Sequence, residues 1–396
     1  MSEFVSIVRV LALAALAATV FAQESTPPTK QGRYWVQQSS GSLASGGRLR
    51  VSAVGSIVVR GANTNRVGYT LIKRVRARDA DEAIRRLDEA SLTAARQGTA
   101  AALSLAKPSC GRCGFQAELR IEVPHATSEV VIDGHGGVLD VAGIEGRVVA
   151  DSAGGEITLD SIGGSVRATT AGGAIRLGSI GGAVLCETAG GAIQVKKTRG
   201  NAVLTSSGGS IVAGEIGGTL RAETAGGEIR AERVAGSLVA GTSGGSIEIG
   251  EALGSVNVET AGGGIRVASA PRGVRAETAA GDIRLINVGG RVFAASAIGD
   301  ISAAFSGGTP LADSMLEANG GTIVVLIPAG LAVSIEAMVD LAKNLNRIES
   351  DFSSVQVSRA GGEFGGQIVA RGDLNGGGAM LRIRNTSGRI RIRRQE

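Results

Sequence analysis

From Gly137 to Gly308 the chain repeats a nine-residue pattern of small, apolar and polar positions. Stepping by nine gives twenty positions, of which nineteen are Gly and one is Arg272. Two residues after this position, eighteen of the twenty units carry Ile, Val or Leu, and two residues later a small or aliphatic residue follows. Apolar residues at alternate positions are typical of a strand. Each unit therefore predicts one short strand and one tight turn.

Alternate units differ, which makes the true repeat eighteen residues. One class of unit ends in residues such as Ile162 and the other in residues such as Ala153. Two unlike half-turns per coil predict an all-β fold, a parallel β-solenoid with roughly 18-residue two-strand coils. Stacking would then place Ile175 between Ile157 and Ile193. We expect the glycines to supply positive φ and close backbone approach at both corners. A meander of antiparallel hairpins is the alternative, and strict register over twenty units favours stacking.

The flanking segments predict further units. Residues 23–46 are rich in Ser, Gln, Gly and Pro and predict a flexible linker. Residues 47–133 predict a small β-β-α-β unit preceding the solenoid. Its amphipathic helix of about four turns has Asp79 as the cap and Glu82 closing a capping box, and Gly98 ends the run. We assign residues 134–311 to the β-solenoid repeat region.

Residues 312–396 predict a C-terminal β region that closes the solenoid. Residues 340–365 are irregular and are expected to form a loop, after which an alternating pattern returns. Arg382, Arg384, Arg391 and Arg393 would point outward from a terminal strand, where charge opposes edge-to-edge aggregation.

Residues 1–22 resemble a secretory signal peptide. Arg9 precedes an apolar run that ends in Val20-Phe21-Ala22, a small-x-small cleavage pattern, and polar residues follow. An uncleaved anchor is the alternative, but the run is shorter than the ~20 residues of a membrane span. We therefore expect an exported protein without a transmembrane span after cleavage, located in the periplasm, at the outer-membrane surface or outside the cell.

The amino-acid composition favours a hydrophobic core made of many small, similar layers over one large globular core. Hydrophobic residues make up 43% of the 396 residues but aromatic residues only 3%, while Gly reaches 62. The formal net charge is +5, and the last sixteen residues contain six Arg and one Glu. Lys73-Arg74-Val75-Arg76 could attract nucleic acid, but export favours anionic glycans or lipid headgroups, so no nucleic-acid partner is expected.

Cys110 and Cys113 form the clearest local motif. In an oxidising compartment the simplest interpretation is a disulfide between them. A zinc site would need further ligands from His125, His135 and Cys186, and a redox motif should open a helix. Free thiols are the remaining alternative. We expect no metal, no cofactor and no catalytic residues, because the coils leave no cleft with clustered carboxylates. The outward acids Glu187, Glu223, Glu259 and Glu277 are expected to pair with neighbouring Arg.

Nine hydroxyl residues recur at a spacing of eighteen residues. They could form an outward array that binds ice or a polymer, or an inward ladder bonded to one another and to the turn backbone. The strand parity favours the inward ladder. The nine residues are Ser152, Thr170, Thr188, Ser206, Thr224, Thr242, Thr260, Thr278 and Ser296.

Several stretches together resemble a bacterial family of exported β-strand-repeat proteins of unknown function, usually labelled “putative adhesins”. They are GRLRVSAVGSIVVRG (47–61), DADEAIRRLDEA (79–90), repeats of the SVRATTAGGAIRL type, NGGTIVVLIPA (319–329) and LNGGGAMLRIRNTSGRIRIRR (374–394). The resemblance implies a β-solenoid and no known catalytic residues, and it assigns no role to Cys110 or Cys113.

Three functions follow as hypotheses. The first is a non-enzymatic envelope protein, an adhesin or scaffold that contacts an unknown envelope or cell-surface component. The second is a binding module for an envelope glycan or other anionic ligand, used in envelope stress sensing. The third is an enzyme that acts on carbohydrate. Outward aromatic residues or a cleft with paired carboxylates would favour the second or the third.

Overall fold

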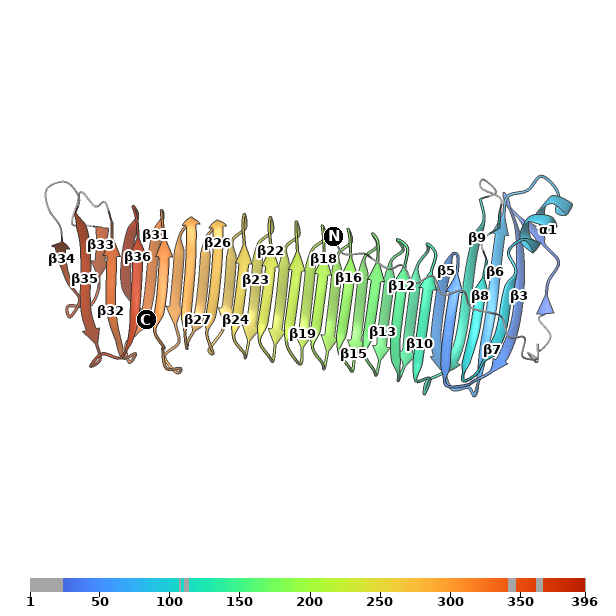
Figure 1. Cartoon of the computed structure of the whole chain (residues 1–396), viewed down its shortest axis with the longest axis horizontal. Helices are drawn as coiled ribbons and strands as arrows, with labels where there is room; N and C mark the ends of the chain where they lie inside the picture. The colour runs from blue at the N-terminus through green and yellow to red at the C-terminus, as the bar shows by residue number, and fades with distance from the viewer. Residues whose placement is uncertain (1–23, 107, 110–113, 341–346, 361–365, 396) are drawn as a thin grey trace, which may run out of the picture.

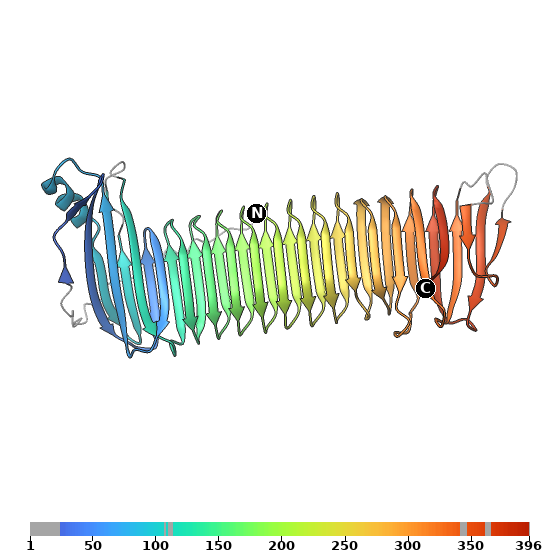
Figure 2. The same ribbon diagram turned by 180° about the vertical axis from the view of Figure 1, so that it is seen from behind.

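The computed structural model describes residues 24–106, 108–109, 114–340, 347–360 and 366–395. These residues form a long rod in which two β-sheets of 19 and 18 strands face each other (Figure 1). The same straight stack is seen from behind in Figure 2. Strands of the two sheets alternate along the chain through the repeats, and neighbouring strands within a sheet are parallel there. The predicted parallel β-solenoid is confirmed.

Sheet A comprises β1 (Glu24–Ser25), β2 (Thr29–Gln31), β3 (Tyr34–Ala44), β5 (Ser56–Ala62), β6 (Arg66–Val75), β9 (Gln116–Pro124), β11 (Leu139–Ile144), β13 (Ile157–Ile162), β15 (Ile175–Ile180), β17 (Ile193–Thr198), β19 (Ile211–Ile216), β21 (Ile229–Val234), β23 (Ile247–Ala252), β25 (Ile265–Ser269), β27 (Ile283–Val288), β29 (Ile301–Phe305), β31 (Thr322–Pro328), β33 (Ile348–Ser350) and β37 (Arg389–Gln395).

Sheet B comprises β4 (Arg48–Ala53), β7 (Leu92–Gln97), β8 (Ala100–Leu105), β10 (Glu129–Gly134), β12 (Arg147–Ser152), β14 (Val166–Thr170), β16 (Val184–Thr188), β18 (Ala202–Ser206), β20 (Leu220–Thr224), β22 (Leu238–Thr242), β24 (Val256–Thr260), β26 (Val274–Ala280), β28 (Val292–Ile298), β30 (Ser314–Ala318), β32 (Val333–Val339), β34 (Gln356–Ala360), β35 (Gln367–Leu374) and β36 (Ala379–Asn385).

The register is the predicted eighteen residues. Ile175 pairs with Ile157 on one side and with Ile193 on the other, and all three side chains are fully buried. In sheet B, Val184 lies between Val166 and Ala202 in the same way. The inward columns from the two sheets meet between them and form one continuous hydrophobic core. Burial of aliphatic side chains against identical neighbours above and below therefore holds successive coils together.

The corner glycines act through close approach, and the prediction of positive φ was wrong for the regular coils. From Gly146 to Gly263, no described glycine has a positive φ. A Cβ on Gly191 would instead lie 1.9 Å from the carbonyl oxygen of Gly173 in the preceding coil. The first glycine of the same pair, Gly190, has no neighbour closer than 3.8 Å to such an atom. The second glycine is thus required because stacked corners leave no room for a side chain.

The N-terminal segment is part of the rod, so the prediction of a linker over residues 23–46 was wrong. Residues 34–44 form β3, which pairs antiparallel with β6 over ten residues, and β6 pairs with β9. Gly41 leaves room for a ring, because a Cβ there would lie 2.3 Å from the hydroxyl oxygen of Tyr69. The polar composition suggested a linker, but this strand covers the end of the stack.

Residues 47–133 supply coils of the same solenoid rather than a separate preceding unit. β4 pairs in parallel with both β8 and β10, and β5 pairs in parallel with both β9 and β11. The coil β4–β5 therefore lies between the coils β8–β9 and β10–β11. The expected boundary at residue 134 is not a structural break.

The predicted helix is confirmed at its start and was too long at its end. Helix α1 spans Ala80–Asp88, and the Asp79 carboxylate accepts the backbone N–H of Glu82 at 2.8 Å. Glu82 in turn accepts the backbone N–H of Arg78. Residues 92–97, which continued the apolar stripe, form β7 and pair with β8. Sheet pairing outweighs helical periodicity there.

The C-terminal end has the mirror arrangement. β36 pairs with both β30 and β32, and β37 pairs with both β31 and β33, so the coil β36–β37 lies one position inside the end. The prediction that its arginines protect a terminal strand was therefore wrong. Arg391 and Arg393 form ion pairs with Glu349 of β33, and the outer strands are β33 and β34. The loop expected over residues 340–365 contains both of these strands.

Candidate functional site

The cysteine predictions have different outcomes. Cys110 and Cys113 lie outside the described residues, as does the segment 1–22, so the disulfide stays a prediction. Cys186 occupies an inward position of β16 and is fully buried. Burial raises the pKa of its thiol far above the usual range, with a smaller effect from Glu187. This thiol is therefore neither nucleophilic nor accessible.

The hydroxyl column is an inward ladder that bonds to the turn backbone. Thr188 donates its hydroxyl to the carbonyl oxygen of Gly173 at 3.0 Å and accepts the N–H of Gly191 at 3.1 Å. The same pair of bonds recurs at Thr224, Thr242 and Thr260. These hydroxyls are buried, so they join coils and offer no outward array.

The two histidines lie in different surroundings. The Nδ1 atom of His125 lies 2.7 Å from the carbonyl oxygen of Gly143, and that of His135 lies 3.6 Å from Asp133. Within the part of the chain that the structure describes, no three His, Cys, Asp or Glu side chains could hold a metal ion together. Nor does that part contain a helix with the length and apolarity of a membrane span.

The basic strand at residues 73–76 divides its charges between the core and the surface. Lys73 is buried and donates to the carbonyl oxygens of Leu87 and Ala90 at 2.7 and 3.1 Å, which caps the C-terminal end of α1. Burial lowers the pKa of its amine. Arg76 instead lies on the surface over the ring of Tyr34, and their hydrogen bond at 3.2 Å lowers the pKa of the phenol.

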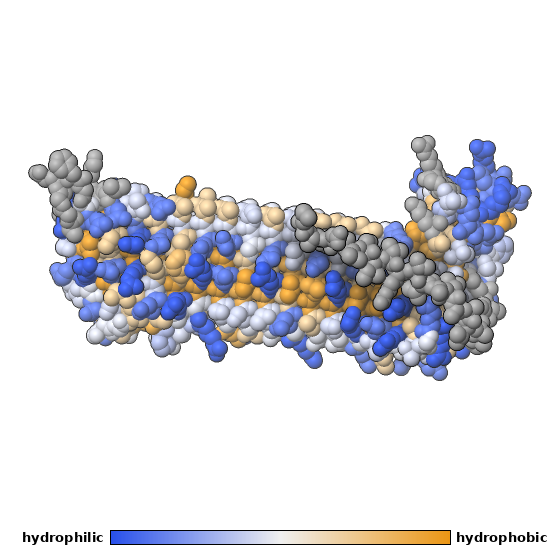
Figure 3. Space-filling view, in the orientation of Figure 1, coloured by the Kyte–Doolittle hydropathy of each residue, from blue (hydrophilic) through white to orange (hydrophobic). Residues whose placement is uncertain are grey.

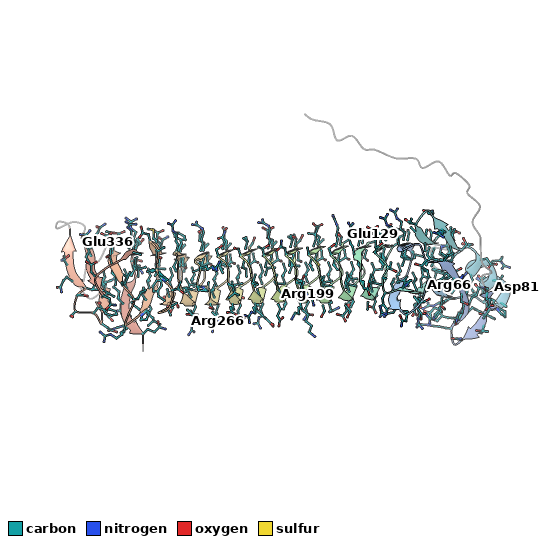
Figure 4. All side chains as sticks on the ribbon, turned by 90° about the horizontal axis from the view of Figure 1, so that it is seen from below. Arg66, Asp81, Glu129, Arg199, Arg266 and Glu336 are labelled. Atoms are coloured by element: carbon teal, nitrogen blue, oxygen red, sulfur yellow. The ribbon has the colours of Figure 1, made fainter. Side chains whose placement is uncertain are left out.

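The outer face of sheet A is charged and largely self-paired. Arg230 and Glu248 lie on adjacent coils with their charged atoms 2.6 Å apart, and Lys197 and Glu215 are equally close. Seen edge-on, the labelled Arg266 of this sheet and Glu336 of sheet B project on opposite sides of the rod (Figure 4). Because these pairs are exposed, they satisfy surface charge and add little stability.

The outer face of sheet B is different, because one outward row is mostly apolar. We call this row the band. Arginine occupies every third coil of the band, and seven of the eight positions between successive arginines are apolar. In stacking order the band is Arg50, Val131, Val149, Arg167, Leu185, Val203, Arg221, Val239, Asn257, Arg275, Phe293, Met315 and Arg382. Figure 3 shows the resulting alternation of charged and apolar patches along the rod.

Carboxylates line one side of the band. This acidic row lies two residues further along each strand and contains Asp133, Asp151, Glu187, Glu223, Glu259, Glu277 and Glu317. An open groove of about 710 Å³ follows its C-terminal half from Glu223 to Glu317. Gly241 and Ala295 stand in the same row and leave space between the longer side chains.

Neighbouring carboxylates in this groove are poorly arranged for glycosidic chemistry. Glu259 and Glu277 are register partners on adjacent coils. Parallel in-register residues project from the sheet in the same direction, whereas a glycosidase places its two carboxylates on opposite sides of the bond that breaks. Glu277 is also ion-paired with Arg275. The arrangement can bind a cation or a donor but does not flank a substrate.

Four of these acids were predicted to point outward, but the band was not predicted. Its signal appears only when every eighteenth residue from Val149 is read, because arginine then returns after 54 residues at Arg167, Arg221 and Arg275. When each coil is compared only with the next one, the residues at this position differ and no pattern is visible.

Comparisons with known proteins found weak similarity to solved structures only. No protein-family model matches the chain, and no curated protein is significantly similar to it. A putative adhesin from Bacteroides fragilis aligns over 65% of this chain and 98% of its own, with 14% identity and a TM-score of 0.34. A putative cell adhesion protein from Clostridium sporogenes aligns over 91% and 100%, with 8% identity and a TM-score of 0.18.

A third solved structure gives a similar result. A putative adhesin from Parabacteroides distasonis aligns over 74% of this chain and 90% of its own, with 10% identity and a TM-score of 0.24. At these values the strand pairing described above, and not the likeness, establishes the fold. The three neighbours carry adhesin or cell-adhesion names.

Proposed function

We propose that this protein is a non-enzymatic, exported rod of the cell envelope that acts as an adhesin or scaffold. The observation that carries the proposal is the outer face of sheet B, which presents the band over a long stack of coils. From β11 to β29 the corners between successive strands are two to four residues long, so no long loop interrupts this part of the face. A long, flat and rigid surface suits lateral contact with a partner better than enclosure of a small substrate.

The chemistry of the described residues supports a binding role. The buried Cys186 offers no nucleophile, and the groove beside the acidic row is open to solvent along its length. Catalysis of group transfer usually needs a site that excludes water around converging groups. Such a groove suits an extended partner that lies along the rod.

The proposal is tested in two stages. A C-terminally tagged full-length chain should leave the cytoplasm and appear in the periplasmic, surface or medium fraction, with its N-terminus near Gln23. Beads coated with residues 23–396 should then be retained on intact cells or isolated envelopes more than beads coated with an unrelated protein of equal net charge. Cytoplasmic retention of the chain, or bead retention equal to the control, would contradict the proposal.

A second candidate function is the binding of an anionic envelope glycan, from which a role in envelope stress sensing would follow. It is favoured by the N-terminal end of the rod, where Lys30 lies 6.0 Å from the centre of the Trp35 ring. Arg33 and Arg76 each lie 5.3 Å from the centre of the Tyr34 ring. Both rings are half-buried, and cations beside partly exposed rings can bind acidic sugars through charge and stacking.

Alginate serves as a polyanionic probe for this second candidate. Binding should weaken with salt and with the double variant R33A/R76A. The matched control is R371A, which removes an arginine at the opposite end of the rod. Equal binding by both variants would exclude the N-terminal cluster.

A further inference from the structure

We infer that the outer face of sheet B, from β16 to β30, docks a cationic amphipathic polypeptide segment of another protein. The inference rests on the proposed function and names its partner chemistry. Its first support is the band itself. Val203 is 36% exposed, and Leu185, Val239, Phe293 and Met315 are partly exposed on the same flat row. Adjacent coils are ~4.8 Å apart, so this part of the band is a row tens of ångströms long in which apolar side chains are interrupted by Arg221, Asn257 and Arg275.

The arginines of the band do not make this strip cationic. Arg221 and Arg275 form ion pairs with Glu223 and Glu277, two residues along the same strands, and the Arg275 guanidinium lies 4.4 Å from the centre of the Phe293 ring. Both arginines are thus folded onto the surface and neutralised by the acidic row.

The acidic row keeps unpaired charge after these pairs are made. Within the described part of the chain, Glu187, Glu259 and Glu317 form no ion pair, although Arg384 of β36 is the register partner of Glu317. The groove beside Glu259 and Glu317 leaves their carboxylates open to a partner. The opposite side of the band carries small or neutral residues, such as Asn201, Thr219 and Ser237, until Arg291 and Asp313 at its C-terminal end. The surface is therefore a mostly apolar row with one acidic edge and one mostly neutral edge.

The complement of such a surface is a segment with apolar side chains on one face and Lys or Arg along one side. Long basic side chains can place their apolar stems beside the band and their charges on the acidic row. A glycan fits less well, because Phe293 is the only aromatic ring in the band. An anionic partner would meet the unpaired carboxylates.

A second copy of this chain also fits less well. A two-fold axis along the rod would place each band arginine, such as Arg221, opposite its own copy. A two-fold axis across the rod, within the interface, would place the acidic row against itself. Either symmetric pairing brings like charges together, which disfavours association.

The test uses residues 23–396 and synthetic peptides that contain Leu and Lys in an amphipathic order. The wild-type rod should bind this peptide, whereas polylysine and a peptide with Glu in place of Lys should bind much less. The double variant E259Q/E317Q should lower affinity about tenfold, because two exposed charge pairs are together worth ~1–2 kcal/mol. The double variant V203S/V239S should also weaken binding, since it removes apolar contact.

The matched control lies on sheet A. V212S/E232Q removes one outward apolar residue and one carboxylate that has no ion pair among the described residues, so its affinity should stay close to that of the wild type. Equal losses in the sheet A and sheet B variants would overturn the inference, as would equal binding of polylysine or preferred binding of alginate. If beads adhere to cells but the Leu-Lys peptide does not bind, the inference fails while the proposed function stands.

Discussion

The regular middle of the rod and its two ends are built from similar coils with different connectivity. In the middle, each coil consists of consecutive residues and pairs with the coil eighteen residues away, as Ile175 does with Ile193. At each end, a coil that is distant in sequence lies between two other coils, one position inside the end of the rod. Ser314 of β30 pairs with Leu381 of β36, and Arg48 of β4 pairs with Glu129 of β10.

This difference separates two kinds of stability. A middle coil contacts only its neighbours, so its removal should leave an equivalent interface. An inserted end coil joins two segments distant in sequence, and its closure costs loop entropy that a middle coil does not incur. Antiparallel strands then cover each end, with β3 and β6 on one side and β34 and β35 on the other. The two ends are therefore held together by pairing between distant segments, whereas the middle is a uniform stack of consecutive coils.

The largest expected effect comes from removal of whole coils. Deletion of residues 376–396 removes β36 and β37, and with them the layer between β30–β31 and β32–β33. We expect the C-terminal end to detach and become sensitive to protease. Deletion of residues 175–192 should instead give a folded rod shorter by ~5 Å, the height of one coil.

Limited proteolysis, circular dichroism and small-angle scattering distinguish these outcomes. The two deletions remove similar lengths of chain, which makes each the control for the other. If both variants unfold equally, the middle coils are not interchangeable and the contrast between middle and ends is lost.

The next effect concerns a single coil of the middle. Ile193 is fully buried, so Ile193→Asp places an unpaired charge in the core and should lower the free energy of unfolding by more than ~3 kcal/mol. Arg176 lies outward beside Ile175 and pairs with Glu156, so Arg176→Ala should lower it by less than ~0.5 kcal/mol. Urea unfolding measures both, and similar losses would refute the inward and outward assignment.

The middle of the fold could be predicted because the residues that determine each strand lie close together in the sequence. The alternation around Ile175 and the return of Gly every nine residues determine the strand, its face and its partner. The ends could not, since nothing near Leu381 indicates that its partner is Ser314. The role of Gly191 depends on the Gly173 carbonyl of another coil, which is why positive φ was the wrong reason for a correct position.

The candidate site was harder to predict than the fold. Glu223 and Glu277 were recognised as outward, but each was assigned only to charge pairing. The band depends on a 54-residue period, and a row such as Leu185 and Val203 gains meaning only after the register is known. Surface function in a solenoid is thus encoded across coils, while the fold is encoded within them.

A smaller effect tests the corners of the middle coils. Gly191→Ala places a Cβ where the Gly173 carbonyl oxygen lies, so the coils must separate locally, and we expect a loss of ~1–3 kcal/mol. Gly190→Ala adds the same atom with no neighbour closer than 3.8 Å and should change stability by less than ~1 kcal/mol. Thermal unfolding of the pair is the measurement. Equal melting temperatures of the two variants would show that the stacked corners can separate without a loss of stability.

The smallest effects come from two carboxylates that join coils, one in the middle and one at an end. Asp160 accepts the backbone N–H of Ser179 in the next coil at 2.9 Å, and this hydrogen bond lowers its pKa. Asp351 follows β33 and accepts hydrogen bonds from the Arg393 guanidinium at 2.7 Å and the Arg394 N–H at 3.1 Å, which lower its pKa. Both groups therefore bind protons more weakly in the folded chain than in the unfolded chain.

The sign of the pH dependence follows from these lowered pKa values. Each carboxylate stabilises the fold fully above its ordinary pKa of ~3.9, and this contribution is lost as the pH falls through the lower pKa of the folded state. Asp160→Asn and Asp351→Asn should thus be less stable than the wild type near neutral pH and approach its stability in acid.

High salt should reduce only the stability difference between Asp351→Asn and the wild type, because the main partner of Asp351 is a charged guanidinium whereas Ser179 donates a neutral N–H to Asp160. Urea midpoints across pH at low and high salt measure both, with Asp151→Asn as an outward control. A salt effect on Asp160→Asn equal to that on Asp351→Asn would show that middle and end coils are joined by the same kind of interaction.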